Sequence, residues 1–144
     1  MNRQELQRKI LTVAAGLVLL PPLLLVASLL VGILNPDPGA NIKAIIIVLS
    51  VLAILHLVIR IGYLRNIRAI KQGRPVDRGL NVGIGILLLT SCLCILDGAV
   101  HSYDHNLYVS ILMFTAAFID FVTALASIGT IFLKPKTGNQ ANSE

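Results

Sequence analysis

Charged residues are scarce in this chain of 144 residues: they make up only 13% of it, about half the share that soluble domains carry. That scarcity excludes an ordinary water-soluble globule. Intrinsic disorder is excluded as well, because disordered chains combine few apolar residues with many charges, whereas 56% of this chain is apolar. The mean hydropathy of +0.82 therefore indicates an integral membrane protein.

Cysteine is also rare, and Cys92 and Cys94 both lie inside one apolar run. Two residues apart on a helix, their side chains point about 160° away from each other. They do not form the C-x-x-C motif of a membrane thiol oxidoreductase. The chain also lacks the G-x-S-x-G, Walker and G-x-G-x-x-G motifs of common enzyme classes. We therefore expect a protein that is not an enzyme and has no cofactor.

Acidic residues are fewer than basic ones, 7 against 12, which leaves a net charge of +5. In a soluble domain this excess would suggest nucleic-acid binding. In a membrane protein an excess of basic residues instead indicates which side of the membrane each loop occupies. We therefore expect no nucleic-acid partner.

Long apolar segments are abundant, and a bilayer core about 30 Å thick needs about 20 apolar residues per helix. The predicted spans are 10–34, 42–64, 80–101 and 109–133. The predicted fold class is an all-α integral membrane protein with four transmembrane helices in an up-down bundle, forming one domain over residues 1–136. Pro21 and Pro22 predict a kink in the first span, because neither has a backbone N–H. The polar segment 137–144 is predicted to be a disordered cytoplasmic tail.

The basic residues predict the orientation of these spans. Every one except Lys43 falls in a segment on the same side of the membrane as the two termini. The positive-inside rule puts that side in the cytoplasm, so we predict an N-in, C-in protein of the bacterial cytoplasmic (inner) membrane.

A basic cluster separates the second and third spans, where the second helix is expected to run beyond the membrane until Gly73 and Pro75 stop it. Its members are Arg60, Arg65, Arg68, Lys71, Arg74 and Arg78. Each charge near a membrane surface contributes on the order of 1 kcal/mol of attraction to anionic lipid headgroups. A bilayer with anionic headgroups is therefore an expected partner, and the alternative is that the cluster acts only as a topology signal.

Asp120 lies near the middle of the fourth span, where an aspartate costs roughly 2.5 to 3.5 kcal/mol on insertion scales unless it is sheltered. It shares a helical face with Ala116, Thr123 and Ser127, a stripe of small and hydroxyl residues that we expect to pack against protein. His56 in the second span lies at the same depth. Two arrangements follow: a His56–Asp120 pair, or a protonated Asp120 and a His56 that each bond other groups.

A second polar stripe follows one face of the third span, at Thr90, Cys94, Asp97 and His101. Because the connection to the fourth span is short, we expect the two stripes to face each other or a shared neighbour. Thr90 and Asp97 are then predicted to join Asp120 and His56 in one intramembrane polar site.

The outer end of the third span also allows a metal interpretation. Its candidate ligands are Asp97, His101, Asp104 and His105. A His pair at i and i+4 with carboxylates on the same face can supply three ligands to zinc or a similar divalent ion. The chain has no H-E-x-x-H motif, so a polar cap at the membrane interface is the competing interpretation.

Two classes of function follow from these features. The first is a non-enzymatic accessory, regulatory or immunity-type subunit whose polar stripes pack against helices of another integral membrane protein or of a second copy. The second is a small oligomeric proton-linked or ion transporter, with Asp120 as its protonatable site and His56, Thr90 and Asp97 along the route. Four spans can hardly surround a solute path, so the sequence favours the subunit.

Overall fold

The computed structural model describes residues 3–34 and 42–133. Within these ranges every regular element is a helix. The helices are α1 (Arg3–Leu17), α2 (Leu20–Leu34), α3 (Ile42–Lys71), α4 (Arg78–Tyr103) and α5 (Leu107–Phe132). The predicted tail at 137–144 and the last two basic residues, Lys134 and Lys136, lie outside the described residues.

Four segments are long and apolar enough to cross a membrane: α1 together with α2, then α3, α4 and α5. Even α4 and α5, with 26 residues each, extend about 39 Å, which exceeds the thickness of a hydrocarbon core. Large apolar side chains cover their outer surfaces, as a lipid environment requires. The predicted all-helical class and the number of helical segments that could span a membrane are therefore confirmed for the described part of the chain.

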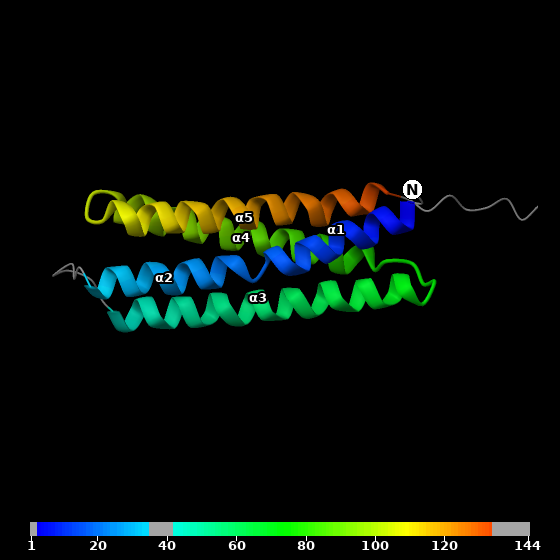
Figure 1. Ribbon diagram of the computed structural model, residues 1–144, viewed down its shortest axis with the longest axis horizontal. Coiled ribbons are helices and arrows are strands. Elements are labelled where there is room, and N and C mark those ends of the chain that lie inside the picture. The colour runs from blue at the N-terminus through cyan, green and yellow to red at the C-terminus, as the bar shows by residue number, and fades with distance from the viewer. Residues whose placement is uncertain (1–2, 35–41, 134–144) are drawn as a thin grey trace, which may run out of the picture.

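The first span is interrupted at Val18 and Leu19, where α1 ends and α2 begins. Because Pro21 and Pro22 have no N–H, the carbonyl groups of Leu17 and Val18 lose the donors they would have in a continuous helix. The predicted kink is confirmed as a break between two helices, which Figure 1 shows as a short stretch of coil between α1 and α2.

Local signals explain where the other helices begin and end. After α3 ends at Lys71, Gly73 adopts a positive φ of 71°, which a residue with a Cβ rarely does. The carboxylate of Asp77 caps α4 by accepting from the N–H of Leu80 at 3.0 Å. Asn106 caps α5 in the same way.

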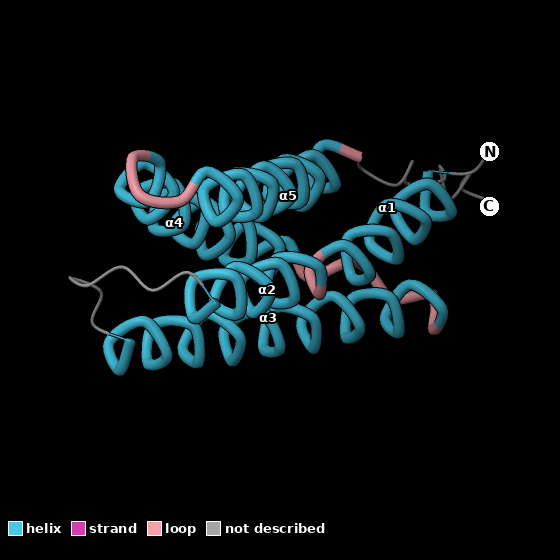
Figure 2. The backbone as a smooth tube through the Cα atoms, turned by 60° about the vertical axis from the view of Figure 1, so that its left-hand side comes forward, coloured by secondary structure: helices cyan, strands magenta, loops and turns pink. Residues whose placement is uncertain are grey.

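The four spans form a ring. Helix α4 packs most extensively against α5, α5 also packs against α1 and α2, and α3 contacts α1, α2 and α4. Helices α3 and α5 occupy opposite corners, and their backbones do not come into close contact within the described ranges. Figures 1 and 2 show α1 and α2 lying end to end beside α3. Side chains from α3 and α5 can therefore meet only on the axis of the bundle.

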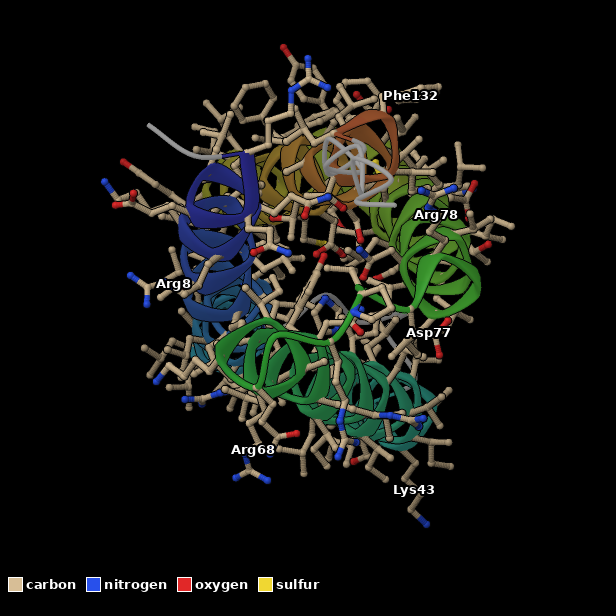
Figure 3. All side chains as sticks on the ribbon, turned by 90° about the vertical axis from the view of Figure 1, so that its right-hand side faces the viewer. Arg8, Lys43, Arg68, Asp77, Arg78 and Phe132 are labelled. Carbon is tan, nitrogen blue, oxygen red and sulfur yellow. The ribbon has the colours of Figure 1, made fainter. Side chains whose placement is uncertain are left out.

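Basic residues gather at one end of the ring, which is formed by the start of α1, the end of α3, the start of α4 and the end of α5. We call this the basic end. Figure 3 looks onto it and shows Arg8, Arg68 and Arg78 pointing outward from the bundle, with Lys43 at the far end.

The interior contains two clusters of buried apolar side chains, one toward each end. The cluster nearer the basic end includes Leu11, Val18, Tyr63, Leu88 and Ala124. The cluster nearer the opposite end includes Leu25, Leu52, Ile95, Ala116 and Ala117. The candidate site lies where these two clusters meet.

Candidate functional site

His56 from α3 and Asp120 from α5 meet on the axis of the bundle, and both side chains are 0% exposed. The imidazole Nε2 lies 2.9 Å from Oδ1 and 3.1 Å from Oδ2 of the carboxyl group. Of the two arrangements that the sequence leaves open, the structure has the pair. Since α3 and α5 occupy opposite corners, this contact joins two helices whose backbones do not touch.

The other ring nitrogen determines how many protons the pair holds. Nδ1 of His56 lies 2.7 Å from the carbonyl oxygen of Leu52, which can only accept, so Nδ1 carries a hydrogen. One further proton then lies between Nε2 and the carboxyl group of Asp120. Whether the pair is an imidazolium beside a carboxylate or an imidazole beside a carboxylic acid, it has no net charge. A titratable pair is thus buried without an isolated charge.

The stripe of small and hydroxyl residues around Asp120 faces the interior, as the sequence predicts. Ala116, Thr123 and Ser127 are all 0% exposed. The hydroxyl of Tyr63 on α3 lies 3.5 Å from the carbonyl oxygen of Thr123. Polar groups therefore continue from the pair toward the basic end.

Closer to the basic end, buried amide and hydroxyl groups connect all four spans. Asn81 on α4 donates from Nδ2 to Thr130 Oγ1 on α5 at 2.8 Å. Asn66 on α3 donates to Asn81 Oδ1 at 2.6 Å, and Gln7 on α1 donates to the carbonyl oxygen of Thr130 at 2.9 Å. The hydroxyl of Ser127 donates to the carbonyl oxygen of Asn81 at 3.2 Å. We call these five residues the amide network.

The sequence interpretation missed four members of this network: Gln7, Asn66, Asn81 and Thr130. Asn81 and Thr130 lie inside the predicted third and fourth spans, where a polar side chain needs a partner within the protein, so both carried a usable signal. Gln7 and Asn66 lie among charged residues at the predicted membrane surface. Nothing in the sequence distinguishes them there from solvated side chains.

The polar stripe of α4 faces away from the pair. Its four members, Thr90, Cys94, Asp97 and His101, are exposed, and the Asp97 side chain is 78% exposed. The prediction that Thr90 and Asp97 join His56 and Asp120 is therefore wrong.

Close packing of α4 against α5 explains this orientation. A Cβ at Gly85 would lie 2.7 Å from Ile128, and a Cβ at Gly98 would lie 2.6 Å from Met113. These two glycines lie on the α4 face that approaches α5. Glycine has no side chain, so it allows the close van der Waals contact that drives helix association in lipid. The hydroxyl of Thr90, on the outward face, instead donates within its own helix to Ile86 at 3.0 Å.

Of the candidate metal ligands, the structure brings together Asp97 and His101, whose Nδ1 lies 3.6 Å from Asp97 Oδ1. Asp104 follows the last turn of α4, and the backbone N–H of His105 donates to the carbonyl oxygen of Ser102. Over residues 3–34 and 42–133, no group of three or more His, Cys, Asp or Glu residues could hold a metal ion. The arrangement therefore gives the metal interpretation no support.

The basic cluster lies along the end of α3 and the loop that follows it, where all of its members except Arg60 are exposed. A groove of about 730 Å³ opens beside Arg65, Arg68 and Arg74 and is also lined by the apolar side chains of Ile61 and Leu64. Positively charged and apolar side chains therefore line this groove together.

No protein-family model, curated protein or solved structure matches this chain. Its function therefore has to be argued from its own residues.

Proposed function

We propose that this chain is a non-enzymatic accessory, regulatory or immunity-type subunit of the bacterial inner membrane. It packs against a transmembrane helix of another membrane protein, or of a second copy, through the outward polar stripe of α4. The observation that carries this proposal is Asp97, an exposed acid on an outer surface that is mainly apolar.

The position of Asp97 in the helix makes its exposure costly. It lies six residues before the end of α4 at Tyr103, which is about 9 Å along the helix. A 26-residue helix centred in a 30 Å core leaves Asp97 about 5 Å inside the hydrocarbon. Exposed apolar side chains at Leu93 and Val100 lie on either side along the sequence. A partner helix that donates a hydrogen bond to Asp97 removes the cost of leaving the acid in lipid.

The proposed topology is an up-down bundle with both termini in the cytoplasm. Its support is the concentration of basic residues at one end of the ring, with Lys43 at the other (Figure 3). In this orientation the amide network lies on the cytoplasmic side, and Asp97 lies on the outer side.

Affinity purification of the tagged full chain in mild detergent tests the subunit function. Asp97→Leu and Thr90→Leu are expected to abolish recovery of the partner. Thr115→Leu is the matched control, because Thr115 is also exposed and also donates to its own helix, at 2.8 Å. Equal recovery by all three variants, or no companion with the parent chain, would overturn the proposal. A differently tagged second copy in the same cells distinguishes self-association from a foreign partner.

A second candidate function, a small oligomeric proton-linked transporter, is favoured by the buried His56–Asp120 pair. Asp120→Asn in proteoliposomes is expected to abolish proton or solute flux while the helices remain folded. Asp97→Asn is the control and is expected to retain flux, because Asp97 lies on the outer surface. Unchanged flux in Asp120→Asn would remove this candidate.

A further inference from the structure

We propose that the His56–Asp120 pair is a proton-binding site that exchanges its proton with water through the basic end of the bundle, and not through the opposite end. This inference goes beyond the subunit function and deepens the proton-linked candidate by naming the side of entry. A role of this site in transport rests on the proton-linked candidate function. One-sided access of the proton to the pair does not depend on that function.

A series of buried polar groups lies between the pair and the basic end. On α5, Asp120 is followed on the same face by Thr123, Ser127 and Thr130, each at most 1% exposed. Asp120 and Thr130 are ten residues apart, or about 15 Å along the helix. The Tyr63 hydroxyl lies beside Thr123. Each turn of α5 between the pair and Thr130 thus carries a buried hydroxyl group, and those of Thr123 and Thr130 donate to carbonyl groups of their own helix.

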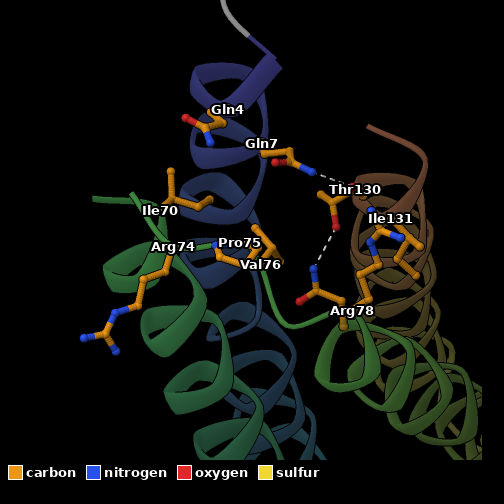
Figure 4. Close-up of a pocket in the computed structure, with 10 residues that line it drawn as sticks. Gln4, Gln7, Ile70, Arg74, Pro75, Val76, Arg78, Thr130 and Ile131 are labelled. Carbon is orange, nitrogen blue, oxygen red and sulfur yellow. Dashed lines mark hydrogen bonds between the residues drawn. The ribbon is translucent and has the colours of Figure 1, made fainter. Parts of the chain in front are cut away.

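This series, which we call the polar line, ends at a cavity of about 50 Å³ at the basic end, which Figure 4 shows in close-up. Gln7, Asn81 and Thr130 line it together with Arg74 and Arg78 from the loop and the start of α4. A cavity needs roughly 10 to 15 Å³ of such volume to hold one water molecule, so this one admits more than one. Water can therefore reach the far end of the polar line.

The opposite half of the interior has no comparable line within the described residues. Leu52, Ile95 and Ala116 belong to the apolar cluster that closes this half. The buried polar side chains described there are Ser28 and Ser110, and each hydroxyl donates to a backbone carbonyl, at 2.7 and 2.8 Å. Fewer of the described buried polar side chains thus lie between the pair and the opposite end than between the pair and the basic end.

Among the titratable side chains described near the axis, the His56–Asp120 pair is the one that we expect to exchange a proton near neutral pH. The other titratable side chains near Asp120 are Tyr63 on α3 and Cys92 on α4, both ordinarily uncharged at neutral pH. The buried residues described in α1 and α2 include no titratable side chain. Ser91 on α4 is buried, and its hydroxyl has no hydrogen-bond partner among the described residues. In the register of α4 against α5, Ser91 lies at the level of Asp120 and offers the pair one more hydroxyl group.

Exchange of the His56 ring proton with water tests this route. The full chain carries His101→Gln and His105→Gln, so that His56 is its sole imidazole, and is labelled with nitrogen-15 histidine. It is reconstituted in vesicles of phosphatidylethanolamine and phosphatidylglycerol, and NMR follows exchange of the ring proton into heavy water. Ser127→Ala is expected to slow exchange of the ring proton, because it removes one hydroxyl group from the polar line. Ser110→Ala is expected to leave the rate unchanged.

Ser127 and Ser110 are matched: both lie on α5, both are 0% exposed, and each donates to a carbonyl group of α4. Equal slowing by the two variants, or slowing by Ser110→Ala alone, would overturn one-sided access. Neither flux nor a partner enters the measurement, so its failure is distinct from failure of either proposed function.

A second measurement does not require the pair to keep its geometry. In a Cys92→Ala, Cys94→Ala background, a small thiol reagent is expected to label Ser127→Cys, which faces the polar line. Ala117→Cys is expected to stay unlabelled. Ala117 is 1% exposed and lies three residues from Asp120, toward the opposite end of the bundle. Labelling of Ala117→Cys without labelling of Ser127→Cys would place the access route at the opposite end.

Discussion

Nε2 of His56 lies 2.9 Å from Oδ1 of Asp120, although the helices that carry these residues occupy opposite corners of the bundle. A contact across the axis holds α3 and α5 at a fixed separation. Because each polar group depends on the other for its hydrogen bond, the stability of the bundle should respond to the two residues jointly.

The pair is expected to behave as one energetic unit in a double-mutant cycle. His56→Leu or Asp120→Leu alone leaves a buried polar group without its partner and is expected to lower the free energy of unfolding by about 3 to 5 kcal/mol. The double variant is expected to recover most of that loss, because no unpaired group remains. Unfolding monitored by circular dichroism in detergent measures this coupling, and strictly additive losses would contradict it.

The amide network is expected to stabilise the basic end of the bundle. Asn81→Leu leaves the buried amide of Asn66 and the hydroxyl of Thr130 with fewer partners, and is expected to cost about 1 to 3 kcal/mol. Thr90→Val is the control, because it removes an exposed hydroxyl that bonds only its own helix. A loss for Thr90→Val as large as that for Asn81→Leu would contradict the assignment. Thermal unfolding of the two variants in the same detergent measures the difference.

Two glycines on α4 are expected to respond in opposite directions to the same substitution. Gly85→Ala places a Cβ 2.7 Å from the Ile128 side chain and is expected to destabilise the protein by about 1 to 3 kcal/mol, since that side chain must shift. Gly83→Ala meets nothing within 4 Å. It is expected to stabilise the helix by about 0.5 to 1 kcal/mol. Unfolding midpoints that shift in the same direction for both would contradict the close α4–α5 contact.

Reporter fusions test the orientation. A fluorescent protein that folds only in the cytoplasm is expected to be bright when fused after Glu144 or inserted at Gly73, because the basic residues retain both segments on that side. A fusion inserted at Asn106, between α4 and α5, is expected to be dark. Brightness at Asn106 and darkness at Gly73 would show the inverted orientation.

The groove beside the basic cluster is expected to prefer anionic lipid. Arg65→Gln combined with Arg68→Gln is expected to weaken the binding of phosphatidylglycerol, by on the order of 1 kcal/mol for each charge. Binding of phosphatidylcholine is expected to stay unchanged. Lys43→Gln, at the opposite end, is the control for loss of charge alone. Native mass spectrometry of lipid-bound species measures the difference, and equal effects of Lys43→Gln would contradict a defined site.

The placement of His56 and Asp120 could be anticipated because depth is nearly a one-dimensional property. A count of residues along each apolar run gives the depth of a side chain, at 1.5 Å per residue, without any knowledge of neighbouring helices. That count puts the two residues at one level, and the cost of an unsheltered acid in lipid favours a partner. Depth alone does not show whether His56 and Asp120 bond each other or bond separate partners. That depends on the rotation of α3 and α5 about their axes.

The orientation of α4 could not be anticipated in this way. Its sequence offers two distinct faces, one with Thr90 and Asp97 and the other with Gly85 and Gly98. Polarity alone favours turning the first face inward. The structure turns the second face inward, because α5 places Ile128 and Met113 where glycine lets the helices close together.

By itself, the sequence determined that the described chain is helical, how many membrane-length segments it has, where a proline pair breaks the first, and which end is basic. These properties depend on local composition and on length. Only the tertiary structure decided which helical faces meet, and therefore that Asp120 is paired, that Asp97 lies outward and that Gln7, Asn66 and Asn81 form a buried network. Those outcomes depend on the fit between surfaces far apart in the sequence, and no single segment contains that information.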